Sequence, residues 1–452
     1  MAIRATVARR LQAIHPRTIK VLTNSFWGLL IKGAGIIVSL LSVPITFDFL
    51  DKTTYGVWLT LSSLLTLVGL LDIGIGNGLR NRFAEAVTTQ NYSLAQSYLS
   101  TAYGLFTGIQ LGFVLLFVLI NPYIPWVSVL NTTLDAGSLQ IAALITFVAL
   151  GVRLILDLLS YVLYALQQTA RAGLIQLVAN TLILIGVYAT SRYAHGDLTK
   201  LAFITAFSPI VVLLCGSLLL YRTSLKQYRP RLDAVNWRQT SYLLSLGYKF
   251  FIIQIAVIVI FYTDNFIISQ LFGPGEVATY NIAYRYFNVV NTVFAILIAP
   301  FWSAITEAHV KSDYNWMRTT YQRLRQLWLS VLVAVVIMIV LADYAYHLWM
   351  GNRIIIPFLL SAFMGVSVII SCWNNVAVAI INGTGKIQLQ LYLAIIAATS
   401  NIPLAILFGR YFQLGSAGVI LATCVSLSLS SVVGAMQAGR ILKRTATGIW
   451  DQ

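Results

Sequence analysis

Long apolar segments, separated by short polar or charged ones, run along almost the whole chain. A segment of about 20 apolar residues, at about 1.5 Å each, is long enough to cross the hydrocarbon core of a bilayer. Twelve segments reach that length. The pattern therefore predicts twelve transmembrane helices, near residues 21–50, 56–79, 94–120, 138–164, 172–191, 199–221, 240–272, 277–306, 326–348, 354–381, 387–409 and 415–439.

The composition agrees with this pattern. Of the 452 residues, 58% are hydrophobic and 10% are charged, and the mean hydropathy is +0.81. Soluble domains carry about 25% charged residues. The net charge of +16 is spread over many loops, so no compact basic domain exists to bind nucleic acid, and we expect no nucleic-acid partner. The composition therefore predicts an all-α integral membrane protein.

The basic residues predict the orientation of the helices. With the twelve segments above, 21 of the 30 Lys and Arg residues fall at the same side as the N-terminus and five at the other side. Loops rich in Lys and Arg stay on the cytoplasmic side of a membrane. We therefore expect a multi-pass protein with both termini in the cytoplasm.

The chain also shows a weak internal repeat. The segment LDKTTYGVW at 50–58 resembles LFGPGEVATY at 271–280, and ALQQTARAGLIQ at 165–176 resembles IINGTGKIQLQ at 380–390. Transporters built from two repeated halves often bind substrate between them. The predicted division is a basic N-terminal segment (1–20), a six-helix lobe (21–221), a basic linker (222–239), a second six-helix lobe (240–439) and a cytoplasmic tail (440–452).

Four basic residues fall inside the predicted helices. A charged side chain at the centre of a bilayer costs about 3 kcal/mol on insertion scales, so each is a functional candidate. Ser25 and Ser39 lie seven residues before and after Lys32, which places all three side chains on one helix face. We expect such a face to line a polar cavity. The four cations are Lys32, Arg153, Lys249 and Arg285.

Polar residues on two later segments predict further cavity lining. Asn281, Arg285 and Asn288 are spaced by four and three residues and share a helix face. Asn374 and Asn375 give another segment a polar side, which we expect to face the same space. This pattern also suits hydrogen bonds between helices.

Three acidic residues also lie inside predicted helices: Asp72, Asp157 and Asp264. Arg153 and Asp157 are four residues apart and could form a structural ion pair along one helix. Asp264 lies toward the outer end of its segment, a position that also suits an interfacial residue. We find no Walker motif, no catalytic grouping of Ser, His and Asp, and no cluster of metal ligands, so we expect neither an enzyme nor an ATP-driven pump. Because Lys and Arg favour phosphate and carboxylate, the sequence predicts secondary transport of an anion.

Several motifs resemble a known family. The segments Asn24–Pro44, Tyr55–Trp58 and Leu70–Ala86 resemble polysaccharide-biosynthesis flippases of the O-antigen exporter type, in the multidrug/oligosaccharidyl-lipid/polysaccharide (MOP) exporter superfamily. Tyr280 and the run Gly383–Lys386 also fit. The resemblance covers most of the chain and is strongest in the first 90 residues. It implies two six-helix lobes that form a MATE-like, V-shaped bundle around a central cavity.

The resemblance also implies a function. Such flippases move undecaprenyl-pyrophosphate-linked oligosaccharide from the cytoplasmic to the outer leaflet of the bacterial inner membrane, by alternating access and with a proton or sodium gradient. It implies contact with membrane lipids and with polysaccharide polymerase machinery, and no cofactor beyond the coupling ion. On this interpretation the four cations bind pyrophosphate or sugar acids, and the ion-coupling candidates are Asp72, Asp157 and Asp264.

Two other functions remain open at this point. One is a cation-coupled multidrug exporter of the same superfamily, which would favour acidic residues in its cavity. The other is a non-transporting membrane scaffold of a polysaccharide assembly complex, in which the buried charges would pair with one another.

Overall fold

The computed structural model describes residues 16–66, 75–166, 168–192, 197–240, 255 and 263–451. Every regular element in these ranges is a helix, and nine of the helices have the length and hydropathy of a membrane span. The prediction of an all-α membrane protein is therefore confirmed. The predicted segment 240–272 falls mostly outside the described residues.

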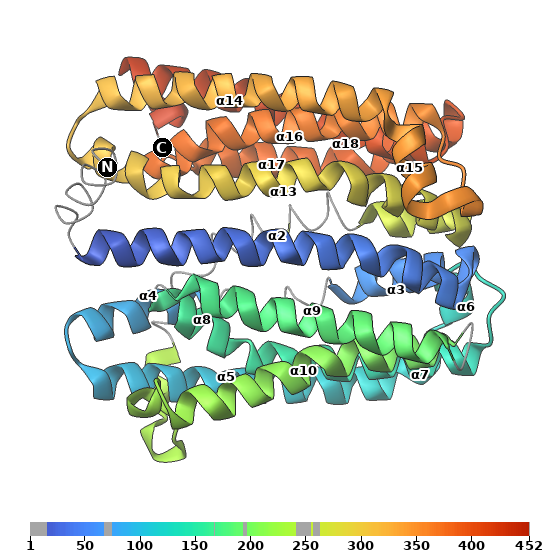
Figure 1. The fold of residues 1–452 in the computed structure, drawn as a ribbon. Coiled ribbons are helices and arrows are strands. Elements are labelled where there is room, and N and C mark those ends of the chain that lie inside the picture. Colours follow the sequence, from blue (N-terminus) through green and yellow to red (C-terminus); the bar gives the residue numbers. More distant parts are fainter. Residues whose placement is uncertain are drawn as a thin grey trace, which may run out of the picture.

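The helices of the first half lie together in the lower part of Figure 1. They are α2 (Pro16–Leu50), α3 (Lys52–Thr66), α4 (Ile75–Thr88), α5 (Tyr92–Ile120), η2 (Asn121–Tyr123), α6 (Trp126–Val129), α7 (Ala136–Leu156), α8 (Leu158–Ala165), α9 (Thr169–Ser191) and α10 (Leu198–Arg222). Three short turns follow: η3 (Lys226–Tyr228), η4 (Leu232–Ala234) and η5 (Trp237–Gln239).

The helices of the second half form the upper part of Figure 1. A helix at 263–272 precedes them. The elements that follow this helix are α13 (Pro274–Val310), α14 (Tyr314–Val340), α15 (Ala342–Met350), η6 (Gly351–Arg353), α16 (Phe358–Thr384), α17 (Gln388–Ile406), the π-helical turn η7 (Leu407–Tyr411), α18 (Ser416–Lys443) and η8 (Gly448–Asp451).

Two of the predicted segments differ from single straight helices. Segment 138–164 is divided at Asp157 into α7 and α8, and segment 326–348 is divided at Leu341 into α14 and α15. In segment 56–79, α3 ends at Thr66, and α4 begins at Ile75 but continues to Thr88. A hydrophobic segment shows which residues can lie within the membrane. It does not show where the helix is interrupted, because the residues on both sides of each interruption are apolar.

Polar side chains fix where four of the helices begin. Each one accepts a hydrogen bond from a backbone N–H in the first turn of its helix, which satisfies a donor that has no partner within the helix. The hydrogen bonds that Asp135 accepts from Ser138 also lower the pKa of its carboxyl group. The capping residues are Asn91, Asp135, Asp197 and Asp313, at 2.8–3.1 Å from the nitrogen.

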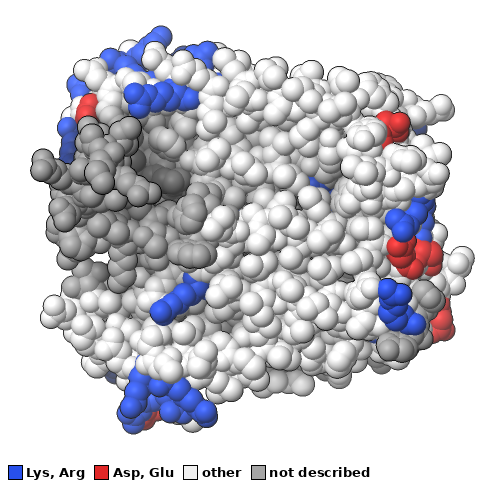
Figure 2. Space-filling model, viewed as in Figure 1, with Lys and Arg blue, Asp and Glu red and all other residues white. Residues whose placement is uncertain are grey.

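Charged residues gather at the two ends of the bundle. On the face shown in Figure 2, Lys, Arg, Asp and Glu lie mostly at the two ends, and the broad band between them is nearly free of charge. We call the end where α2 begins and α18 finishes the terminal end, and the other the distal end (left and right in Figure 1). Basic loop residues predominate at the terminal end, as the loop pattern predicts.

The two groups of helices meet at α2 and α13. The α2 helix lies against α9 of its own group and also contacts α13 of the other group (Figure 1). At the distal end, an ion pair of 2.7 Å joins Arg353 to Asp48. Nearby, the Asn131 side chain donates a hydrogen bond of 2.8 Å to the Ser269 carbonyl oxygen. These contacts hold the groups together at that end.

The backbones of the two groups approach each other closely between α3 and α13. A Cβ atom added at Gly56 would lie 1.7 Å from the carbonyl oxygen of Pro274, so only glycine fits at this position. Beside it, Asn281 donates to Asn265, and Asn265 donates to the Ser63 hydroxyl, at 2.7 and 2.6 Å. Backbone contact and a chain of hydrogen bonds thus fix the distal end.

We expect Gly56→Ala to destabilise the protein, because the backbone of α13 must move away from the new methyl group. Forced overpacking costs roughly 1–3 kcal/mol. The measurement is the thermal unfolding midpoint of purified protein in detergent. Gly33→Ala on α2 is the matched control, because nothing lies within 4 Å of a Cβ added there. Equal midpoints for the two variants would contradict the assigned contact.

Candidate functional site

A cavity of about 810 Å³ lies where the two groups of helices meet. Its wall comes from α2, α7, α8, α9, α10 and α13, so both groups contribute. The volume is in the upper part of the range of ligand pockets, which is roughly 300–1,000 Å³. Its polar lining consists of Lys32, Ser39, Arg153, Asp157, Ser160, Tyr161, Tyr164, Gln176, Asn180, Arg285, Asn288, Asn291 and Thr292.

Three of the predicted cations line this one cavity. Lys32 comes from α2, Arg153 from α7 and Arg285 from α13, so three different helices bring them together. Lys32 is exposed, and the other two are half-buried. None of the three forms an ion pair within the described part of the chain. The described lining therefore carries three positive charges and a single negative one, from Asp157.

Arg285 links the two groups of helices. Its Nη1 donates two long hydrogen bonds to Ser39 on α2, of 3.4 Å to the backbone oxygen and 3.3 Å to the hydroxyl. A guanidinium group has five N–H donors. These two contacts orient Arg285 and leave donors for a ligand. They also bring Ser39 and Arg285 together. Both residues line the cavity, which is where the sequence predicts them.

The Arg153–Asp157 ion pair that the spacing allows is not formed. The α7 helix ends at Leu156, and Asp157 occupies the break before α8. The Asp157 carboxylate instead accepts a hydrogen bond of 2.7 Å from the hydroxyl of Ser160. The backbone turn from Arg153 to Asp157 is intact, since the Asp157 N–H donates to the Arg153 carbonyl oxygen at 2.8 Å. The bond with Ser160, and not a break between the two residues, therefore takes the place of the ion pair. Both side chains line the cavity.

The polar stripe on α13 lines the cavity over part of its length. Arg285, Asn288 and Thr292 are lining residues, but Asn281 is not. The prediction for Asn281 is wrong. Its amide belongs to the network with Asn265 described above, because at this height α13 packs against the neighbouring helices.

Asn374 and Asn375 face a second cavity, of about 320 Å³, enclosed by α13, α16, α17 and α18. The prediction that they face the same space as Lys32 is therefore wrong. The two cavities share Asn291 of α13 as a lining residue.

Asp264 is buried within the second group of helices. Its carboxylate accepts a hydrogen bond of 2.6 Å from the Tyr280 hydroxyl and one of 3.5 Å from the Thr423 hydroxyl. Its other oxygen is buried without a partner in the described structure. With 2% of its surface exposed, Asp264 is not interfacial, because α13 and α18 cover it. It lines a space of about 20 Å³ together with Asn288 and Asn291.

Three predicted site residues are not tested by the structure. Lys249 and Asp72 lie outside the described residues, and the side chain of Ser25 is likewise not described.

Sequence reasoning missed several lining residues. Gln176 and Asn180 are on one face of α9, where the first amide donates a hydrogen bond of 2.9 Å to the second. Their spacing of four residues inside an apolar segment was an available signal. Asn291 lies beside the predicted stripe of α13 and was not distinguished from its neighbours.

Comparisons with known proteins point to one family. Residues 21–305 match the family model described as "Polysaccharide biosynthesis protein". A protein of Yersinia pseudotuberculosis assigned to O-antigen export is 20% identical over 379 residues, which are 81% of this chain and 84% of the relative. A protein of Salmonella typhimurium assigned to O-antigen transport is 23% identical over 284 residues, 62% of this chain and 63% of the relative. Both are named for transport and not for an enzymatic reaction.

Solved structures with the same fold include transporters of the MATE family and of the MOP superfamily. An inward-facing multidrug resistance MATE family transporter of the MOP superfamily has a TM-score of 0.77 at 14% identity, with 93% of this chain and all of that chain covered. A MOP superfamily transporter from Pyrococcus furiosus, whose binding pocket is described as having reverse polarity, has a TM-score of 0.68 at 14% identity, with 95% and 96% covered.

These structural likenesses show the fold, and they confirm the predicted MATE-like bundle. The family model matches more than half of the chain. The chain is therefore a multi-pass membrane protein that belongs to the polysaccharide biosynthesis protein family.

Proposed function

We propose that this protein moves a lipid-linked oligosaccharide, carried on a polyprenyl pyrophosphate, from the cytoplasmic to the outer leaflet of the bacterial inner membrane. One observation carries the proposal. Lys32, Arg153 and Arg285 converge on a cavity between the two groups of helices, and Asp157 is the only acid in its described lining. The names of the O-antigen relatives support the same substrate class.

The chemistry of the cavity suits a diphosphate. Arg binds phosphate oxygens through parallel N–H donors, and Lys supplies a compact positive charge. Such charges cost several kcal/mol to keep at membrane depth, and a bound anion offsets that cost. The sugars would occupy the polar parts of the lining, and the polyprenyl chain would remain in the lipid between the groups.

The places where the groups are joined support a cycle of alternating access. The ion pair and the glycine contact lie at the distal end. With both termini in the cytoplasm, as the loop charges predict, the distal end faces the outer leaflet. The proposed cycle breaks these distal contacts and closes the terminal end, so that the cavity is exposed to each side in turn.

The charge of the cavity argues against export of cationic drugs. An organic cation would meet three like charges and one acid in the described lining. Like-charge repulsion is strong where the effective dielectric constant is low. A scaffold without transport is also disfavoured, because charges inside its helices would pair with acids, and these three cations form no ion pair in the described part of the chain.

We propose Asp264 as the group that couples transport to a proton or sodium gradient. A buried carboxylate with an unpartnered oxygen is costly unless it binds a proton or a cation. The residue shares a small space with Asn288 and Asn291, which also line the large cavity. Binding or release of a proton or a sodium ion at Asp264 would therefore change the part of the cavity wall that contacts the substrate.

We expect Lys32→Ala and Arg285→Ala each to reduce glycan export more than tenfold, because each removes a charge that faces the diphosphate. The measurement is surface glycan in a host whose own flippase gene is deleted, with the amount of membrane-inserted protein determined in parallel. Arg410→Ala is the control, since Arg410 is exposed at the distal end, away from the cavity. Normal export by both cavity variants would refute the cationic site.

We expect Asp264→Asn to abolish the response of transport to an ion gradient, because asparagine keeps the shape but can neither release a proton nor balance a sodium ion. The measurement is transfer of a lipid-linked oligosaccharide in proteoliposomes under an imposed pH or sodium gradient. Asp343→Asn, at an exposed acid, serves as the control. Gradient-driven transport that equals the wild type would exclude Asp264 as the coupling group.

A further inference from the structure

We infer that the second cavity is a binding site for an uncharged sugar, the part of the substrate that follows the diphosphate. This inference rests on the proposed function and names a separate subsite for it. The cavity of about 320 Å³ lies among α13, α16, α17 and α18. Its volume is at the lower end of the range of ligand pockets.

The lining of this second cavity is polar without being charged. The polar side chains are amides and hydroxyls, and the described lining contains no Lys, Arg, Asp or Glu. Amides both donate and accept hydrogen bonds, as neutral sugars require. The remaining lining is aliphatic and suits the C–H faces of a sugar ring. The polar residues are Asn291, Ser371, Asn374, Asn375, Gln390, Ser430 and Gln437.

Two of these amides have an oxygen atom without a partner in the described part of the chain. The side-chain oxygens of Gln390 and Gln437 are buried without a hydrogen bond in the described structure. Gln437 is fully buried. An unpartnered buried polar atom costs about 1–3 kcal/mol, so its retention needs an explanation. A ligand with hydroxyl or N–H donors supplies the missing partners.

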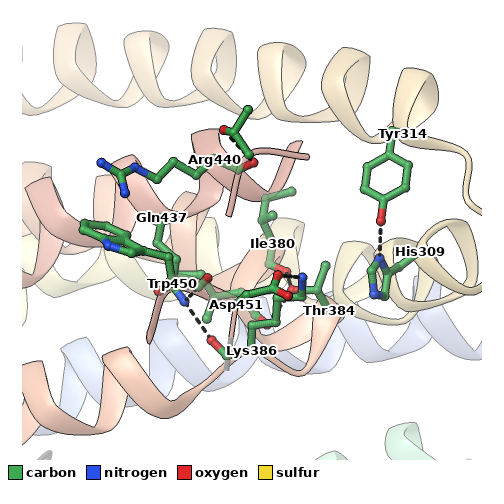
Figure 3. Close-up of polar contacts among 11 residues, drawn as sticks. His309, Tyr314, Ile380, Thr384, Lys386, Gln437, Arg440, Trp450 and Asp451 are labelled. Carbon is green, nitrogen blue, oxygen red and sulfur yellow. Dashed lines mark hydrogen bonds and ion pairs between the residues drawn. The ribbon is translucent and has the colours of Figure 1, made fainter. Parts of the chain in front are cut away.

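Gln437 is held in place by the C-terminal segment. Its Nε2 donates to the backbone oxygens of Lys386, at 3.0 Å, and Trp450, at 3.3 Å (Figure 3). Trp450 lies under the guanidinium of Arg440, at 4.2 Å from the ring centroid, and Asp451 pairs with Lys386. Because the amide nitrogen is fixed by two acceptors, the orientation of the whole amide is fixed, and its oxygen is the free atom.

The two cavities are positioned to bind one extended ligand. Asn291 lines both of them, and Ser371 lines both the second cavity and the small space beside Asp264. A diphosphate beside Arg285 would therefore have its neighbouring sugar within reach of α16. Charge would select the diphosphate, and directional hydrogen bonds would select the sugar.

The test compares two kinds of probe on the purified full-length protein. One is a short-chain polyprenyl diphosphate without sugar. The other is the same lipid bearing one glucose, galactose or N-acetylglucosamine. We expect the wild type to bind at least one glycosylated probe about tenfold more tightly than the bare one, which corresponds to one or two added hydrogen bonds.

Gln390→Leu is the most informative variant, because the side chain of Gln390 makes no hydrogen bond in the described structure and leucine keeps its approximate size. We expect this variant to bind the bare probe as the wild type does, to lose the preference for the glycosylated probe, and to be at least as stable to heat. Gln388→Leu is the matched control: Gln388 is on the same helix but is exposed and does not line the cavity.

The outcomes separate the two proposals. If the wild type binds neither kind of probe, the proposed function fails, and this inference fails with it. If the wild type binds all probes equally, or if Gln390→Leu keeps the preference, the sugar site is refuted while the diphosphate site stands. A loss of preference in Gln388→Leu as well would also refute the assignment to this cavity.

Discussion

The interaction on which this structure depends is the repulsion among unpaired cations held between two groups of helices. Lys32 belongs to the first group and Arg285 to the second, and the described wall of their cavity offers one carboxylate. Coulomb energy grows as the effective dielectric constant falls, so this repulsion opposes close approach of the groups inside a membrane. An anion bound between the cations turns the net repulsion between the two groups into attraction. Ligand binding and lobe position are thereby coupled, because the anion interacts differently with the open and closed arrangements.

The α13 helix transmits this coupling along its length. Near its first residue, Pro274 packs against Gly56 of the other group, and Asn281 joins the network that leads to α3. One to three turns further on, Arg285 and Asn288 face the large cavity, and Asn291 lies between the two cavities. One continuous helix thus carries the distal contact, the charge for the diphosphate and the boundary of the neutral pocket. A movement at any of these points displaces the other two.

The sequence predicted those features of the site whose physical cause is local. A cation inside an apolar segment is conspicuous wherever its helix packs, so Lys32, Arg153 and Arg285 were found. The spacing of Asn288 on α13 was equally readable. The prediction for Asn281 failed because a stripe on one helix does not reveal which neighbour covers each part of it.

Other features depend on tertiary packing, which one helix does not encode. The sequence of α16 shows that Asn374 is on a polar face, but only the positions of α17 and α18 decide that this face borders a separate cavity. The helix interruption at Asp157 has no adjacent proline or glycine from which it could have been predicted. Gln437 was not predicted, because its proposed role depends on an unpartnered side-chain oxygen. The orientation of that oxygen is set by the amide nitrogen, which donates hydrogen bonds to two backbone carbonyl oxygens.

The pairing of a charged cavity with a neutral one suits a protein that must release what it binds. A hydrogen bond between uncharged groups contributes a net 0.5–1.5 kcal/mol, about half of what a bond to a charged group contributes. Amide contacts with a sugar therefore add selectivity while adding little to the barrier for release. Additional charges in the same place would hold a diphosphate more tightly but would not distinguish a glycosylated lipid from a bare one. Placing the cations in one cavity and an uncharged polar lining in the next separates retention of the headgroup from recognition of the sugar, and α13 borders both.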